Sequence, residues 1–201
     1  MKLTASGLTC VNTTALDAQV KGESAVRVVK ADKLMEFDTN SYARLDGVHM
    51  KNGTIRVKML SRLLDDAPDF ARGFIGIAFR IDDADASFES FYVRPTNAHV
   101  DDPVRRAHGG QYFAYPTYTF SWFRDRGVTA YECETETGLD EWMTLTCRLR
   151  GDRAEFYLND EAAPRLTVDP LLHGEGSGDG VGLFVDIGTE GFFRDIEIIP
   201  D

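Results

Sequence analysis

The stretch GFIGIAFRIDDADASFESFYVRP, from Gly73 to Pro95, decides the fold. It begins with a nearly continuous apolar run, Gly73–Ile81, which is typical of a strand in the interior of a sandwich of sheets. A short acidic turn leads to a second strand, Phe88–Val93, whose successive side chains point to opposite faces. Tyr92 and Arg94 therefore share one face, and we expect them to project together.

Similar short strands recur along the rest of the chain. Thr54–Leu60 alternates apolar and charged residues, which predicts a half-buried strand. Pairs such as Asn52-Gly53 are chain-reversal signals between strands. About a dozen short strands without βαβ alternation predict two packed antiparallel sheets, with a helical turn at Ala15–Val20 or Leu171–Leu172. The other expected strands are Ser24–Val29, Ser41–Leu45, Tyr118–Phe123, Thr129–Glu134, Met143–Leu149, Ala154–Leu158, Arg165–Val168, Val181–Val185 and Phe192–Ile198.

Composition limits the classes to which the chain can belong. With 201 residues, 43% of them apolar, the chain is long enough for one sizeable core, and we expect a single β-sandwich domain over residues 1–201. A net charge of −11 predicts long-range repulsion from nucleic acids and anionic membranes, so neither is expected as a partner. A neutral ligand, or one recognised locally, is favoured.

Cysteine usage and the N-terminus bear on the cellular compartment. Cys10, Cys133 and Cys147 cannot all pair within one chain, and cysteines in strands are ordinarily small buried apolar groups. The segment MKLTASGLTCVNTT lacks the apolar run of a signal peptide, and no segment approaches the roughly 18 apolar residues of a membrane span. We therefore expect a cytoplasmic protein.

Several stretches, taken in order, resemble one known superfamily. They are SYARLDGVHMKNGTIRVKM, GFIGIAFRIDD, FESFYVRPTN, DDPVRRAHGGQY, LDEWMTLTCRLRGDRAEFYLN and GVGLFVDIGTEGFFRDIEI. In this order they resemble the concanavalin A-like lectin/glucanase superfamily and, within it, the 3-keto-disaccharide hydrolase-like branch. The likeness runs from about Ser41 to Ile198 and implies an all-β, two-sheet antiparallel jelly-roll sandwich. It also implies a saccharide site on the concave sheet.

The resemblance leaves the chemistry open, because the superfamily includes hydrolases, lyases, lectins and non-catalytic modules. Its members often hold a structural calcium ion, and Asp195 is the corresponding candidate ligand here. The acidic run at Asp82, Asp83 and Asp85 lacks the spacing of an EF-hand loop. No dinucleotide fingerprint, phosphate-binding loop or zinc spacing is present, so no cofactor is expected to be required beyond that calcium.

A polar segment, Asn97–Tyr118, is expected to be a loop that borders the saccharide site. Arginines supply planar donors, amides supply donors and acceptors, and aromatic faces stack on sugar rings. The alternative role of this segment is an ion-pair network that holds a long loop to the sandwich. The candidate ligand-binding residues are Tyr92, Arg94, Asn97, Arg105, Arg106, Gln111, Tyr112, Tyr115 and Tyr118.

Three functions fit these residues. The first is recognition of a carbohydrate or glycoside by a lectin-like module. The second is a glycoside hydrolase acting on an oligosaccharide or keto-glycoside, with Glu89 or Asp102 acting together with His108 as catalytic residues. The third is a protein-interaction module. The sequence leaves the sugar, the linkage and the oligomeric state open.

Two further sequence patterns offer alternative catalytic or ligand-binding residues. Glu132 and Glu136, in YECETETG, would share one face of a strand and are alternative catalytic carboxylates, although a solvated outer face is the commoner role of such a pattern. A basic cluster would accept an anionic ligand such as a uronic acid if it also gathered in space, whereas surface ion pairs are its commoner role. The cluster consists of Arg94, Arg105, Arg106, Arg124 and Arg126.

Overall fold

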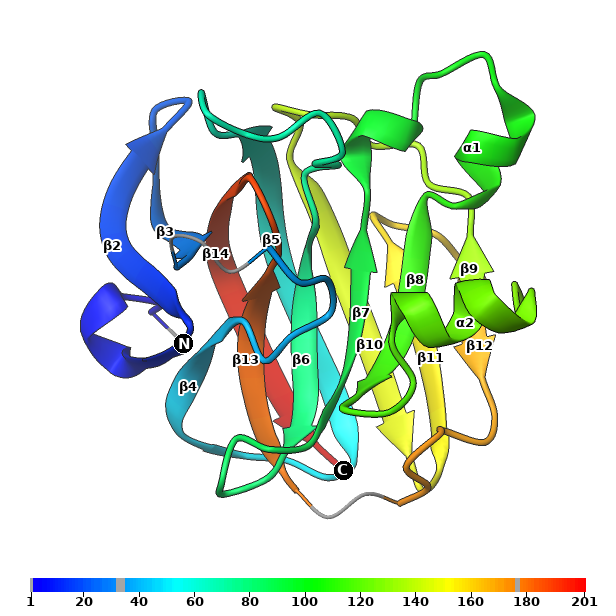
Figure 1. Ribbon diagram of the computed structural model, residues 1–201. Helices are drawn as coiled ribbons and strands as arrows, with labels where there is room; N and C mark the ends of the chain where they lie inside the picture. The colour runs from blue at the N-terminus through cyan, green and yellow to red at the C-terminus, as the bar shows by residue number, and fades with distance from the viewer. Residues whose placement is uncertain (1, 32–34, 176–177) are drawn as a thin grey trace.

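Two antiparallel sheets of seven strands each face one another (Figure 1). The computed structural model describes residues 2–31, 35–175 and 178–201. The first sheet has the order β1 (Leu8–Val11), β4 (Tyr42–His49), β13 (Gly180–Val185), β6 (Ile75–Ile81), β7 (Phe88–Val93), β8 (Gly110–Tyr115) and β9 (Glu132–Cys133). The second has the order β12 (Leu166–Val168), β11 (Arg153–Leu158), β10 (Met143–Arg150), β5 (Gly53–Leu63), β14 (Thr189–Pro200), β3 (Glu23–Lys30) and β2 (Thr13–Val20). The predicted all-β antiparallel sandwich is confirmed.

Short helical segments lie outside the sheets. They are η1 (Ala5–Gly7), η2 (Pro95–Asn97), α1 (Pro103–Ala107) and α2 (Phe120–Arg126). Figure 1 shows α1 and α2 at the side of the molecule where β7, β8 and β9 lie. No helix in the described part of the chain is long and apolar enough to cross a membrane.

One hydrophobic core fills the space between the sheets. Alternation in β5 turns Ile55 and Val57 inward, as the sequence pattern predicts. Near β7, Phe91 of the first sheet stacks on Phe156 of the second, with ring centroids 4.5 Å apart. Both rings are fully buried, and burial of each contributes about 2 kcal/mol to folding.

The outer face of the first sheet is also buried. Side chains of β4, β7, β8 and β13 form a second aromatic cluster there: Tyr42, Phe88, Tyr92, Phe113 and Phe184. Their rings meet edge to face or stacked, with centroids 5.0 to 5.7 Å apart. Figure 1 shows the segment before β4 crossing in front of this sheet. This layer supports one side of the cavity described below.

Local propensity was misleading in several places. The helical turn expected at Ala15–Val20 is wrong, because this segment is the edge strand β2 and pairs residue by residue with β3. The strand expected at Tyr118–Phe123 is also wrong. Phe120 and Phe123 lie three residues apart, so α2 brings both toward the same side, and Gly127 ends the helix with a left-handed φ of 63°.

Three other boundaries differ from the expectation. The Asn97–Tyr118 segment is not one loop, because it contains α1 and the buried strand β8. The strand expected at Thr129–Glu134 is shorter in the structure, where it covers only Glu132–Cys133 and pairs with the start of β8. Leu171–Leu172 forms no helix and leads into a turn. Gly110 begins β8 at a position where a Cβ would lie 2.9 Å from the ring of Phe91, so a larger residue would not fit there.

Candidate functional site

A cavity of about 610 Å³ lies beside the outer aromatic cluster, and we call it the α1–α2 cavity. Its lining comes from the segment before β4, the β5–β6 loop, the end of β7, η2, α1 and α2. Such a volume suits a small ligand of a few rings. The lining residues are Phe37, Phe70, Arg72, Phe74, Tyr92, Arg94, Asn97, Asp102, Val104, Arg105, His108, Phe120 and Arg124.

Arg94 lies at the base of the cavity, directly after β7. The alternation of β7 turns Tyr92 to the outer face, and the guanidinium of Arg94 stacks over that ring at 5.0 Å from the centroid. Nη2 donates to the Tyr92 hydroxyl at 2.9 Å and to the side-chain oxygen of Gln111. Arg94 is only 4% exposed, so its main contacts are with the protein itself.

A buried carboxylate connects Arg94 to α1 and α2. Glu132 Oε1 lies 3.3 Å from Nη1 of Arg94 and 3.7 Å from Nη2 of Arg124. Its Oε2 lies 2.8 Å from Nδ1 of His108, which we assign as the donor because a carboxylate oxygen accepts. The contact fixes the imidazole ring, while Nε2 lies 3.5 Å from Nη1 of Arg124.

Asp102 sets the start of α1. Its Oδ1 accepts hydrogen bonds from the backbone N–H groups of Val104 at 2.9 Å and Arg105 at 3.3 Å, which is a helix N-cap. Pro103 follows at the first helical position. Arg105 then reaches back to η2, where its Nε donates to Oδ1 of Asn97 at 2.9 Å. The helix thereby holds Asp102, Arg105 and His108 along the cavity.

Aromatic rings supply the apolar part of the lining. Phe37 contacts Phe70, Phe74 and Phe120, with centroids 5.5 to 5.7 Å apart. Phe70 keeps 43% of its surface exposed, which is unusual for so large an apolar side chain. The guanidinium of Arg124 stacks on Phe120 at 5.0 Å. The cavity therefore combines flat apolar surfaces with hydrogen-bond donors.

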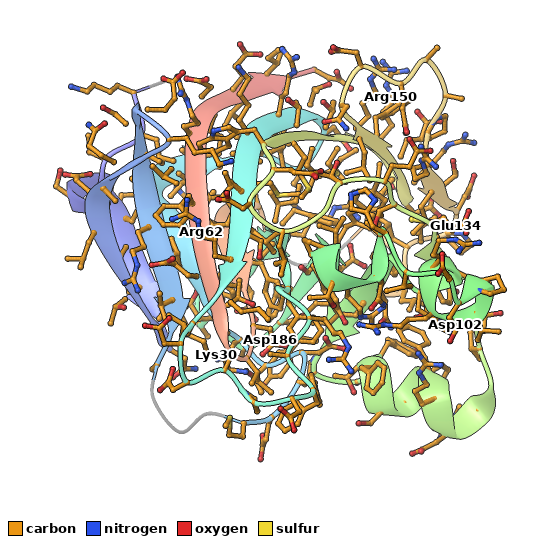
Figure 2. The ribbon with its side chains drawn as sticks, turned by 90° about the horizontal axis from the view of Figure 1, so that it is seen from above. Lys30, Arg62, Asp102, Glu134, Arg150 and Asp186 are labelled. Atoms are coloured by element: carbon orange, nitrogen blue, oxygen red, sulfur yellow. The ribbon has the colours of Figure 1, made fainter. Side chains whose placement is uncertain are left out.

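A buried ionic group lies next to this aromatic lining. Lys30 Nζ is 2.6 Å from Oδ1 of Asp186, and Figure 2 shows the two side chains beside one another. Asp186 Oδ2 accepts from the backbone N–H of Asp38 at 2.8 Å, and Asp38 in turn accepts from the backbone N–H of Phe120. Burial, and then the nearby Asp186 carboxylate, raise the pKa of Asp38 to about 7. Burial also raises the pKa of Asp186.

The structure separates the predicted site residues into two sets. Tyr92, Arg94, Asn97, Asp102, Arg105 and His108 line the cavity. Glu89 and Tyr112 do not. They lie on the inter-sheet side, where the Tyr112 hydroxyl donates to Glu89 Oε1 at 2.9 Å and the backbone N–H of His173 donates to the same oxygen at 3.0 Å. Burial raises the pKa of Glu89. Glu89 and His108 are therefore not brought together in this cavity.

The remaining candidates do not line the cavity. Gln111 is buried beneath Arg94, and Arg106 pairs with Glu134 at 3.4 Å. Tyr115 stacks on Phe88, and Tyr118 packs against Trp122. The alternative carboxylates also separate: Glu132 is buried in the arginine network, whereas Glu136 is exposed and lies 3.5 Å from Arg165.

Asp195 lies in β14 and makes surface ion pairs with Lys58 at 3.5 Å and Arg194 at 3.0 Å. In the described ranges, no group of three or more histidine, cysteine or acidic side chains is arranged to hold a metal ion. The structural calcium that the resemblance implies at Asp195 stays a prediction.

Sequence reasoning missed the lining residues that are distant along the chain. Phe37, Phe70, Arg72 and Phe74 belong to connections before β4 and β6, and only the folded sheet brings them to α1 and α2. Arg124 was part of the expected basic cluster but not of the expected site. The available signal was the density of phenylalanine in polar connecting segments, which strand pairing does not require.

Comparisons with known proteins bear on the fold. No protein-family model matches the chain, and no curated protein matches it in sequence. Among solved structures, the carbohydrate-binding module CBM66 from Bacillus subtilis has a TM-score of 0.63 at 16% identity, over 96% of this chain and 95% of that chain. The cellulose-induced protein Cip1 has a TM-score of 0.50 at 15% identity, over 99% of this chain and 94% of that chain. These likenesses agree with a concanavalin A-like sandwich, and the 3-keto-disaccharide hydrolase-like branch stays a prediction.

Proposed function

We propose that the protein binds a saccharide or glycoside in the α1–α2 cavity. The observation that carries the proposal is the lining, in which phenylalanine rings stand next to guanidinium and amide donors. Sugar rings present apolar C–H faces that stack on aromatic side chains and hydroxyl groups that need donors and acceptors. The likeness to a carbohydrate-binding module is compatible with this function.

Thermal unfolding with a panel of monosaccharides and oligosaccharides tests the proposal. A ligand at a hundred times its Kd stabilises the folded state by about 2.7 kcal/mol, which raises the Tm by roughly 5–10 °C for a domain of this size. Phe70→Ala removes an exposed ring from the cavity and should abolish that shift. Leu16→Ala removes an exposed apolar side chain from β2, outside the cavity lining, and should leave the shift intact.

Failure of every saccharide to raise the Tm at millimolar concentration would contradict the proposal and favour the protein-interaction function. An equal loss of the shift in Phe70→Ala and Leu16→Ala would show that the ligand acts elsewhere.

The second candidate function is hydrolysis of a glycosidic bond, and the hydrogen bond between His108 and Glu132 favours it. A histidine oriented by a carboxylate is a competent general base, and Asp102 lines the same cavity as a second titratable group. Chromatography of each binding saccharide after incubation with the protein would detect products. Product formation that is lost in His108→Gln would support hydrolysis. Recovery of the saccharide unchanged would support binding without hydrolysis.

A further inference from the structure

We propose that the α1–α2 cavity takes an acidic saccharide, in which an oxyanion carried by the sugar ring is held by Arg72 and Arg105. The inference rests on the proposed function, because it names the class of saccharide that the same cavity binds.

Unlike most arginines of the chain, Arg72 and Arg105 form no ion pair with a described carboxylate; Arg126 and Arg148 share this property but stack on the rings of Trp122 and Tyr157. Among the described residues, no carboxylate forms an ion pair with either guanidinium. Arg72 Nη1 donates to the backbone oxygens of Asp69 and Ala71, both at 2.8 Å. Arg105 donates to Oδ1 of Asn97 and to the backbone oxygen of Thr96. All these acceptors are neutral, so no carboxylate of the described residues compensates either positive charge through an ion pair.

The uncompensated cations also act on one another. Partial burial lowers the pKa of Arg72, and the neighbouring charges of Arg105 and Arg94 lower it further. The chain has 33 acidic residues against 22 basic ones, so carboxylates for pairing are plentiful. Half-buried arginines that repel one another in so acidic a protein indicate a place for an external anion. Planar guanidinium groups suit the oxygens of carboxylate or phosphate.

Two acidic groups near the cavity have other partners. Asp102 is the carboxylate of the lining, and its Oδ1 caps α1. Glu132 lies behind the lining and is shared by Arg94, Arg124 and His108. Neither carboxylate pairs with Arg72 or Arg105, so neither neutralises the pair that we assign to the ligand.

The charge does not account for the whole cavity. Phe70 and Phe120 line the cavity together with the arginines, and a small inorganic anion would not cover the exposed surface of Phe70. A neutral sugar would use the rings and leave the positive charges uncompensated. A sugar ring that carries a carboxylate or a phosphate would contact the aromatic rings and also pair with the arginines.

Titration calorimetry on the full chain separates these ligands. Matched pairs of neutral and acidic sugars are glucose with glucuronate, galactose with galacturonate, and mannose with mannuronate; glucose 6-phosphate and inorganic phosphate are measured beside them. We expect one acidic sugar to bind at least about tenfold more tightly than its neutral partner, since a charge-assisted hydrogen bond contributes about 1.5–3 kcal/mol. Arg72→Gln and Arg105→Gln should each remove about tenfold of that affinity.

Arg150→Gln is the matched control for the loss of one positive charge. Its side chain is 78% exposed at the end of β10, and Figure 2 shows it well apart from the cavity residue Asp102. Affinity for the acidic sugar should stay within about twofold of the wild-type value. Thermal unfolding of each variant without ligand confirms that lost binding does not reflect lost folding.

The outcomes distinguish the inference from the proposed function. If neutral and acidic partners bind equally and both glutamine variants bind like wild type, the acidic preference is overturned and saccharide binding stands. If no sugar binds, both are overturned. Inorganic phosphate binding as tightly as glucose 6-phosphate would remove the role of the ring and overturn the inference. A preference for uronates alone assigns carboxylate, and a preference shared with glucose 6-phosphate assigns a general oxyanion site.

Discussion

Replacing Asp38 by asparagine should stabilise the protein increasingly as the pH rises from about 4 to 7 and change little below about pH 4. The pKa of Asp38 is about 7 in the folded protein against 3.8 in an exposed chain, because burial and then the Asp186 carboxylate disfavour its charged form. Between these values the folded protein keeps a proton that the unfolded chain releases. The contribution of Asp38 to stability is therefore complete below about pH 4 and is lost as the pH rises through 7.

The magnitude follows from the gap between the two pKa values. A gap of about 3 pH units, at about 1.4 kcal/mol each, corresponds to a loss of roughly 4 kcal/mol between pH 4 and pH 8. The asparagine side chain does not ionise, so the variant does not lose this part of its stability as the pH rises. It retains an oxygen to accept from the backbone N–H of Phe120, and it tolerates the left-handed φ of 53° at this position. For a domain of this size the difference corresponds to roughly 8–16 °C in Tm.

Calorimetric Tm values of wild type and Asp38→Asn, measured from pH 4.5 to pH 8.5, test this reasoning. The advantage of the variant should increase from pH 4.5 to about pH 7 and then level off, because Asp38 is ionised in both the folded and the unfolded state above that pH. Asp83→Asn is the control, because the side chain of Asp83 is 99% exposed and its removal should give a curve parallel to wild type. Parallel curves for Asp38→Asn as well would refute the assignment of a raised pKa to Asp38.

Two further predictions concern packing. Lys30→Met should destabilise the protein by about 3–5 kcal/mol in urea unfolding, because it leaves the buried Asp186 carboxylate without its cation; an unchanged urea midpoint would contradict this. Gly76→Ala should cost about 3 kcal/mol, since its Cβ would lie 2.0 Å from the backbone oxygen of Phe91. Gly7→Ala, where the nearest atom is 3.9 Å away, is its control, and equal midpoints for both would refute the packing argument.

The fold was predictable wherever the period of the sequence matched the local structure. Thr54–Leu60 alternates with the period of a strand and lies within β5, and the apolar run after Gly73 became β6. The prediction failed where the residue types favoured a strand but the spacing of the apolar residues favoured a helix. Aromatic residues around Tyr118–Phe123 have high strand propensity, but the spacing of Phe120 and Phe123 suits the short helix α2. Edge strand β2 was missed because its pairing with β3 overrides local preference.

The site was predictable only in its local part. Tyr92 and Arg94 were expected on one face from the alternation of β7, and their stacking agrees with that geometry. Arg72 and Phe37 could not be found this way, because their approach to α1 and α2 depends on the pairing of distant strands. Glu132 illustrates the same limit: strand alternation placed it on an exposed face, whereas its 3.3 Å contact with Arg94 joins residues 38 positions apart.

The net charge of −11 and a cavity for anionic sugars are compatible because they act over different distances. In physiological salt the Debye length is about 8 Å, so carboxylates on the distant surface are screened from a ligand inside the cavity. Within that length the ligand meets Arg72 and Arg105, whose charges no carboxylate among the described residues neutralises through an ion pair. An extended polyanion would instead contact the acidic surface over many Debye lengths. The same charge distribution therefore favours a short acidic saccharide over a long anionic polymer.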